Sequence, residues 1–215
     1  MEKLWIKRDN SAELLLFFNG WGMDEKPFRC LDNCSGLDVL MLYDYTELEK
    51  LDIPSSYESI HLTAWSLGVF AAAEVLQGVE LSSSVAVNGT LRPIDEGEGI
   101  APAVFQATID NWREAAAMKF NRRMCLGHYD FFKNNLPERS VESRKNELIA
   151  LREQILNKPV PENIFREAVI SLNDRIFTRH AQETHWRNAR LPVRIIDEPH
   201  YFFPELKSWK DMLFR

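Results

Sequence analysis

The sequence predicts an α/β protein in which helices cover both faces of a mostly parallel sheet. Short apolar runs alternate with helical stretches through about the first 90 residues, and this alternation returns near residue 168. Residues 100–165 differ, because they are rich in charge and in helix formers and show no pattern of parallel strands. We therefore expect a core formed by residues 1–99 and 166–215, with residues 100–165 inserted as a helical cap.

The apolar runs locate the individual strands. Residues 14–18 are continuously apolar, as expected of a strand that is buried on both faces. Residues 67–77 include three consecutive alanines and predict a helix that packs closely on the sheet, and residues 204–214 predict a terminal helix. The other expected strands lie at residues 4–7, 38–43, 59–65, 84–87, 168–172 and 193–196.

Composition narrows the class of protein and its compartment. The formal net charge of -6 argues against a general nucleic-acid binder, which would carry a basic field. No apolar run approaches the roughly 20 residues that a membrane span needs, and the N-terminus lacks the apolar stretch of a signal peptide. The three cysteines, Cys30, Cys34 and Cys125, are sparse and odd in number, which favours reduced thiols. We expect a cytoplasmic protein that binds neither nucleic acid nor membrane.

The strongest chemical signal is Ser66, which stands between the strand expected at 59–65 and the helix that follows it. Residues 64–68 read Ala-Trp-Ser-Leu-Gly. A nucleophilic serine on a tight strand-to-helix turn needs small residues two positions before and two after it, and Ala64 and Gly68 are small. The alternative is an ordinary turn with an exposed serine. The strand-serine-helix context favours the nucleophile of a serine hydrolase with the α/β-hydrolase fold.

A serine nucleophile requires a base and a group that orients this base. In this fold the chain order is nucleophile, acid, histidine. His200 follows the last expected strand and is the candidate base, and Asp174 follows the preceding strand and is the candidate acid. Asp95 is a rival acid after an earlier strand, whereas Asp197 lies too close to His200 in sequence to orient it from another strand.

The oxyanion of a tetrahedral intermediate requires backbone N–H donors at fixed positions. One candidate is the N–H of Leu67, directly after the serine. The second is the N–H of Trp21, in the Asn-Gly-Trp-Gly loop at residues 19–22 that follows an early strand. The histidines lack metal-ligand spacing and no phosphate-binding glycine loop is present, so we expect neither a metal nor a cofactor.

Residues 18–23 (Phe-Asn-Gly-Trp-Gly-Met) and 64–68 resemble the pimeloyl-[acyl-carrier-protein] methyl ester esterases of biotin synthesis, and among these the compact BioG type. Better-known members carry His-Gly-Trp-Gly and Gly-Trp-Ser-Leu-Gly, so Asn19 and Ala64 are departures. The resemblance continues through residues 174–177 (Asp-Arg-Ile-Phe) and includes Gln182, Trp186 and His200; the expected cap matches least.

The resemblance implies an α/β-hydrolase that cleaves the methyl ester of a pimeloyl chain carried by acyl carrier protein. It implies Ser66 as nucleophile, Asp174 as orienting acid, His200 as base, and the N–H groups of Trp21 and Leu67 as oxyanion donors. Two alternatives remain open at this point. One is a general short-chain carboxylesterase or thioesterase with the same triad, and the other is a non-catalytic binding protein of the same fold.

Acyl carrier proteins are acidic, so a basic surface on the expected cap would steer such a partner even though the net charge of the chain is negative. The alternative is an ordinary solvated helix face. The candidate partner-binding residues are Arg122, Arg123, Arg139, Arg144 and Arg152.

Overall fold

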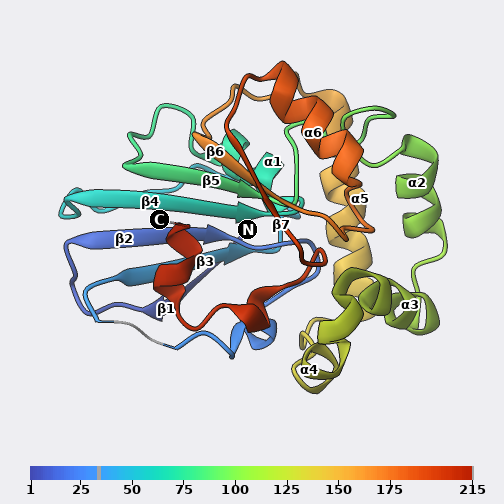
Figure 1. Ribbon diagram of the computed structural model, residues 1–215, viewed down its shortest axis with the longest axis horizontal. Helices are drawn as coiled ribbons and strands as arrows, with labels where there is room; N and C mark the ends of the chain where they lie inside the picture. Colours follow the sequence, from blue (N-terminus) through green and yellow to red (C-terminus); the bar gives the residue numbers. More distant parts are fainter. Residues whose placement is uncertain (33–34, 215) are drawn as a thin grey trace.

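The centre of the computed structural model is a seven-stranded sheet within the described residues, which are 1–32 and 35–214. The strand order is β1-β3-β2-β4-β5-β6-β7, and only the edge pair β1–β3 is antiparallel (Figure 1). The expected mostly parallel sheet is therefore confirmed. The strands are β1 (Glu2–Lys7), β2 (Glu13–Phe18), β3 (Asp38–Tyr43), β4 (Ser59–Trp65), β5 (Ser83–Val87), β6 (Glu167–Ser171) and β7 (Val193–Ile196).

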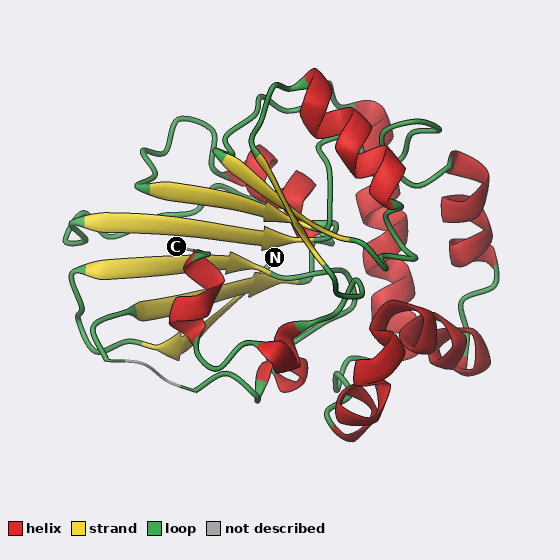
Figure 2. Cartoon of the chain, in the orientation of Figure 1, coloured by secondary structure: helices red, strands yellow, loops and turns green. Residues whose placement is uncertain are grey.

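The two faces of the sheet are covered differently. The α-helices α1 (Gly68–Val75) and α6 (Arg179–Asn188) pack on one face, in a core that includes Leu16 of β2. The other face is covered by loops and short 3-10 helices (Figure 2). There Phe17 packs edge-on against Phe28, with ring centroids 5.0 Å apart. The 3-10 helices on this face are η1 (Lys26–Phe28), η3 (Phe203–Glu205) and η4 (Trp209–Leu213).

The prediction of a single terminal helix over residues 204–214 is wrong, because η3 and η4 are two separate 3-10 helices. Leu206 has an extended backbone (φ -88°, ψ 145°), which ends η3. Ser208 then starts a new turn, in which its side chain and that of Asp211 cap each other's backbone N–H groups. This local capping box overrides the helical propensity of the segment.

The helices of the middle of the chain gather beyond the carboxyl ends of the parallel strands (Figure 1). They all fall between β5 and β6 in sequence. Within the described residues, no helix is long and apolar enough to cross a membrane. The division of the chain at residues 100 and 165 stays a prediction. These helices are α2 (Pro102–Asp110), α3 (Glu114–Cys125), η2 (Leu126–His128), α4 (Tyr129–Asn134) and α5 (Val141–Asn157).

Two of the cysteines are free thiols that lie in or near the core. Burial raises the pKa of the Cys30 thiol to about 11 and that of the buried Cys125 thiol further still. Both thiols are therefore protonated near neutral pH, and neither is an activated nucleophile. Cys34, the third expected thiol, lies outside the described residues.

His185 of α6 is a buried histidine whose contacts require the neutral ring. Its Nε2 accepts the N–H of Leu91 at 3.2 Å, so the proton resides on Nδ1, which donates to Glu98 Oε2 at 2.7 Å. Burial lowers the pKa of His185 although Glu98 acts in the opposite direction.

We expect the free energy of unfolding to fall as the pH drops below about 6.5, because the unfolded chain then binds a proton that folded His185 excludes. The maximum slope for one such group is about 1.4 kcal/mol per pH unit. Urea unfolding between about pH 5.5 and 7.5 measures this slope. His185→Gln keeps a donor and an acceptor but cannot titrate, and its curve should be flatter; parallel curves would contradict the prediction.

Candidate active site

Ser66 occupies a strained turn between β4 and α1. Its φ of +59° lies in the left-handed region, which non-glycine residues rarely adopt. The turn is held by the Ser66 N–H, which donates to Val87 O at 2.9 Å. A Cβ on Gly68 would lie 2.4 Å from Asn19 O, and one on Gly89 would lie 2.3 Å from Ser66 O. The surrounding backbone therefore approaches so closely that only glycine fits at these two positions.

Ser66, His200 and Asp174 form a continuous hydrogen-bonded chain. His200 Nε2 lies 3.0 Å from Ser66 Oγ, and His200 Nδ1 lies 2.7 Å from Asp174 Oδ2. All three residues are buried. The backbone carbonyl of His200 accepts hydrogen bonds from the indole of Trp65 and the amide of Asn88, each at 3.0 Å. These two side chains, which the sequence analysis did not single out, anchor the loop that carries the histidine.

Asp174 is held in place by donors to both carboxylate oxygens. Oδ1 accepts the N–H groups of Ile176 and Phe177 at 2.7 and 3.0 Å. Oδ2 accepts from His200 and from Gln182 Nε2, the latter at 3.0 Å. Gln182, which is part of the resemblance, thus helps to hold Asp174 in place.

The rival carboxylates point elsewhere. Asp95 Oδ1 accepts the N–H groups of Gly97 and Glu98 at 2.8 and 2.9 Å, and the hydrogen bond from Gly97 is the main reason that the pKa of Asp95 is lowered. Asp197 Oδ1 accepts from the Asn173 amide at 2.9 Å. Asp95 therefore closes its own turn, and the structure brings Asp174 to the histidine.

The loop at residues 19–22 lies beside Ser66, and one of its backbone N–H groups has no protein acceptor among the described residues. The N–H of Gly20 donates to Asn19 Oδ1 at 2.7 Å, and the N–H of Gly22 donates to Glu147 Oε2 at 3.0 Å. Within the described part of the chain, the backbone N–H groups of Trp21 and Leu67 have no protein acceptor. Both residues line the same cavity as Ser66, as expected of oxyanion donors.

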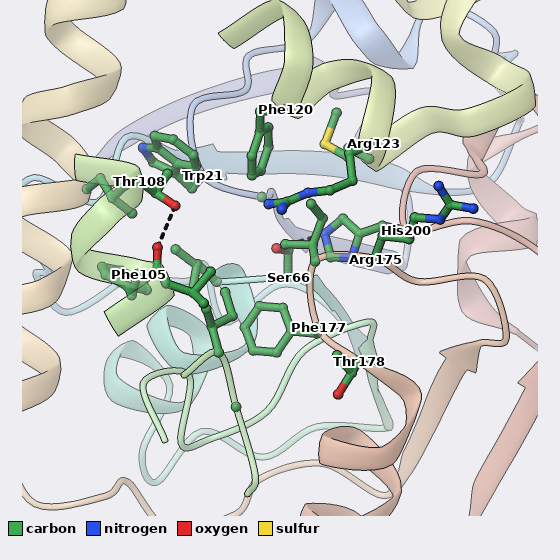
Figure 3. Close-up of a pocket in the computed structure, with 18 of the residues that line it drawn as sticks. Trp21, Ser66, Phe105, Thr108, Phe120, Arg123, Arg175, Phe177, Thr178 and His200 are labelled. Atoms are coloured by element: carbon green, nitrogen blue, oxygen red, sulfur yellow. Dashed lines mark hydrogen bonds between the residues drawn. The ribbon is translucent and has the colours of Figure 1, made fainter. Parts of the chain in front are cut away.

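A cavity of about 200 Å³ opens over Ser66 and His200 (Figure 3). Its walls are mainly apolar and aromatic, and Arg123 and Arg175 add positive charge. Arg175 belongs to the resembling segment at residues 174–177 but is not among the site residues expected from the sequence, although its position directly after Asp174 places it at the same strand end. Residues 1–32 and 35–214 contain no cluster of three or more histidine, cysteine or carboxylate side chains that could hold a metal ion. Apolar and aromatic lining residues include Trp21, Ile100, Val104, Phe105, Phe120, Met124, Leu148, Ile176 and Phe177.

Arg139 is not available to a partner, which corrects one of the five basic candidates. Its side chain is only 9% exposed, and it pairs with Glu147 Oε2 at 2.6 Å and with Asp44 Oδ2 at 2.9 Å. Burial raises the pKa of the Glu147 carboxyl, and the Arg139 guanidinium opposes this shift. Arg139 thus compensates the buried carboxylate of Glu147, a role that depends on the burial of this pair.

The other basic candidates differ in exposure. Arg122 and Arg123 of α3 are exposed, and their guanidinium groups lie over the rings of Tyr129 and Phe120. The Arg144 guanidinium lies over the ring of Trp112, and burial lowers its pKa. Arg152 of α5 pairs with its neighbour Glu153 at 2.7 Å. Arg122 and Arg123 are therefore the candidates whose cations remain accessible without a carboxylate partner among the described contacts.

The sequence of residues 1–212 matches the family described as pimeloyl-ACP methyl esterase BioG. The chain belongs to the BioG family. A crystal structure of BioG from Haemophilus influenzae is 33% identical and superposes with a TM-score of 0.91, over 99% of this chain and 100% of that chain. An uncharacterized protein from Haemophilus influenzae is 38% identical over 199 residues, which are 91% of this chain and 92% of that protein.

Another relative of this BioG chain is much longer. A Bacteroides fragilis protein named malonyl-[acyl-carrier protein] O-methyltransferase is 40% identical over 195 residues, which are 88% of this chain but 39% of that protein. A lipase-esterase related protein from Clostridium acetobutylicum is only 14% identical, with a TM-score of 0.61 over 93% of this chain and 92% of that chain, so it shows the fold alone. The expected family and the expected α/β-hydrolase fold are both confirmed. Membership of the BioG family supports an esterase-like function in biotin synthesis.

Proposed function

We propose that this chain is a serine carboxylesterase that hydrolyses the methyl ester of pimeloyl-[acyl-carrier protein]. The observation that carries the proposal is the hydrogen-bonded chain from Ser66 through His200 to Asp174, with Ser66 Oγ at the floor of an apolar cavity. Such a chain activates a hydroxyl for attack on an acyl carbon without a metal or a cofactor.

In the proposed mechanism, Ser66 Oγ attacks the ester carbonyl and its proton passes to His200 Nε2. Asp174 keeps the other proton of the imidazole on Nδ1 and stabilises the imidazolium. The N–H groups of Trp21 and Leu67 bind the oxyanion. When the tetrahedral intermediate collapses, the C–O bond to the methoxy group breaks and His200 returns the proton, so that methanol leaves. Water then attacks the acyl-enzyme, with His200 again as base, and releases the free carboxylate and Ser66.

The family and the chemistry of the cavity support this substrate class. Apolar walls suit the methylene chain of a pimeloyl group, and the exposed Arg122 and Arg123 on α3 would meet an acidic carrier protein. Arg144 and Arg152, which are less exposed than Arg122 and Arg123, are also proposed partner contacts. Arg139 is not, because its guanidinium is paired with Asp44 and Glu147.

The proposal is tested by offering the purified protein the carrier-bound pimeloyl methyl ester and a small free methyl ester. Release of methanol and mass spectrometry of the carrier give the product. We expect kcat/KM to be at least roughly tenfold higher for the carrier-bound ester, because steering raises the rate of association. Equal kcat/KM values would indicate a general carboxylesterase, and loss of the acyl group from the carrier would indicate a thioesterase.

Arg122→Glu should lower kcat/KM for the carrier-bound ester by about tenfold at low salt, since a rim charge acts mainly on association. Added salt should reduce the wild-type value in the same way, because the Debye length shortens to about 8 Å at physiological ionic strength. The matched control is Arg8→Glu, at the opposite end of the sheet, where β1 pairs with the start of β3. If the two variants lose activity equally, or turnover does not respond to salt, α3 is not the docking surface.

A further inference from the structure

Glu147 is a fully buried carboxylate in the middle of α5, outside the hydrogen-bonded chain of Ser66. Its side chain is 0% exposed. Oε2 accepts the N–H of Gly22 at 3.0 Å and Arg139 Nη1 at 2.6 Å, and Oε1 accepts the N–H of Tyr45 at 3.0 Å. One carboxylate from the inserted helices thus binds the loops that follow β2 and β3.

The Trp21 N–H belongs to the Gly20–Trp21 peptide, and the peptide groups on both sides of that one are anchored. The N–H of Gly20 is held by Asn19 Oδ1 and the N–H of Gly22 by Glu147 Oε2. The indole N–H of Trp21 donates to the carbonyl of Arg144, also in α5, at 2.6 Å. Because each peptide group is planar, anchoring both neighbours leaves the backbone N–H of Trp21 little rotational freedom. That N–H has no acceptor in the described part of the chain, and Trp21 lines the cavity over Ser66.

A buried ion pair is weak evidence for a stabilising role, since an apolar pair of similar volume often stabilises a fold as well or better. Gly22 lies close to α5, because its φ of +74° is left-handed and a Cβ there would lie 3.0 Å from Arg144 Cδ. The loop and α5 are therefore in close contact, in which Glu147 supplies the acceptor for one N–H of each loop.

We propose that Glu147 is a positioning residue, which holds the loop of residues 19–22 so that the Trp21 N–H points at the oxyanion formed on Ser66. This inference rests on the esterase function proposed above. Under this proposal α5 influences the reaction through the loop of residues 19–22. Within the described residues, no α5 side chain forms a hydrogen bond with Ser66 itself. Loss of the carboxylate should weaken transition-state binding and leave ground-state binding intact.

Two variants test this role. Glu147→Gln is isosteric but places an NH2 group against one of the N–H donors. The double variant Arg139→Met with Glu147→Met removes both charges, so no unpaired buried charge destabilises the fold, and it leaves Gly22 without an acceptor. Glu153→Gln is the matched control, because Glu153 lies on the same helix with its side chain 56% exposed.

We expect both test variants to lower kcat for a small ester by about 10- to 100-fold, less than the loss caused by removing an oxyanion donor outright. KM should stay within about twofold of the wild-type value, while the affinity for a boronic acid that forms a tetrahedral adduct falls in parallel with kcat. All rates are normalised to the folded fraction seen by circular dichroism. Glu153→Gln should behave like the wild type.

The labelling of Ser66 by a fluorophosphonate separates the two proposals. A wild-type protein that is not labelled contradicts the esterase function, and the inference on Glu147 fails with it. A wild-type protein that is labelled, together with a folded double variant that reacts at the same rate and binds the boronic acid equally well, overturns the role of Glu147 alone. If Glu147→Gln does not fold, the double variant Arg139→Met with Glu147→Met decides whether Glu147 has this role.

Discussion

Ser66→Ala is expected to fold like the wild type and to lose esterase activity by roughly four to six orders of magnitude. The substitution removes the Oγ that attacks the substrate, and nothing else in the cavity replaces it as an acyl acceptor beside His200 Nε2. The residual rate would come from the oxyanion donors and substrate binding alone.

The fold should tolerate this change because Ala keeps the same backbone strain and only one side-chain hydrogen bond disappears. We expect the melting temperature to shift by less than about 4 °C. Ser55→Ala, at an exposed serine in a loop, is the control and should retain full activity. A folded Ser66→Ala protein with near-wild-type turnover would falsify the assignment of the site as a whole.

Asp174→Asn is expected to lower kcat by about 10³–10⁴. The orientation of the new amide is set by its surroundings, since the N–H groups of Ile176 and Phe177 require an oxygen at the Oδ1 position. The NH2 group must then face His200 Nδ1. This forces the imidazole proton onto Nε2, where the ring can no longer accept the proton of Ser66.

The control for this variant is Asp95→Asn, which alters a carboxylate that closes its own turn with Gly97 and Glu98. Its effect on kcat should be less than about tenfold, since Asp95 has no hydrogen bond to the histidine. If Asp95→Asn were the more damaging change, the orienting acid would have to lie after β5 instead of β6.

The sheet and the turn at Ser66 can be predicted from the sequence alone, because both depend on residues that are close together along the chain. The continuous apolar run of residues 14–18 predicts a doubly buried strand, and β2 occupies Glu13–Phe18. The small residues around Ser66 predict the tight turn, and its φ of +59° with the close approach at Gly68 gives the reason.

The choice among the candidate carboxylates and among the candidate basic residues depends on the tertiary structure. The sequence placed both Asp95 and Asp174 at strand ends, and the choice depends on a hydrogen bond to a histidine 26 positions further on. From the sequence Arg139 is expected to be a surface cation, because nothing local marks its two partners. Asp44 is remote in sequence, and the burial of Glu147 is visible only in the folded chain. Local pattern reveals which residues can form an element, whereas the pairing of polar side chains depends on desolvation and on the three-dimensional arrangement of distant segments.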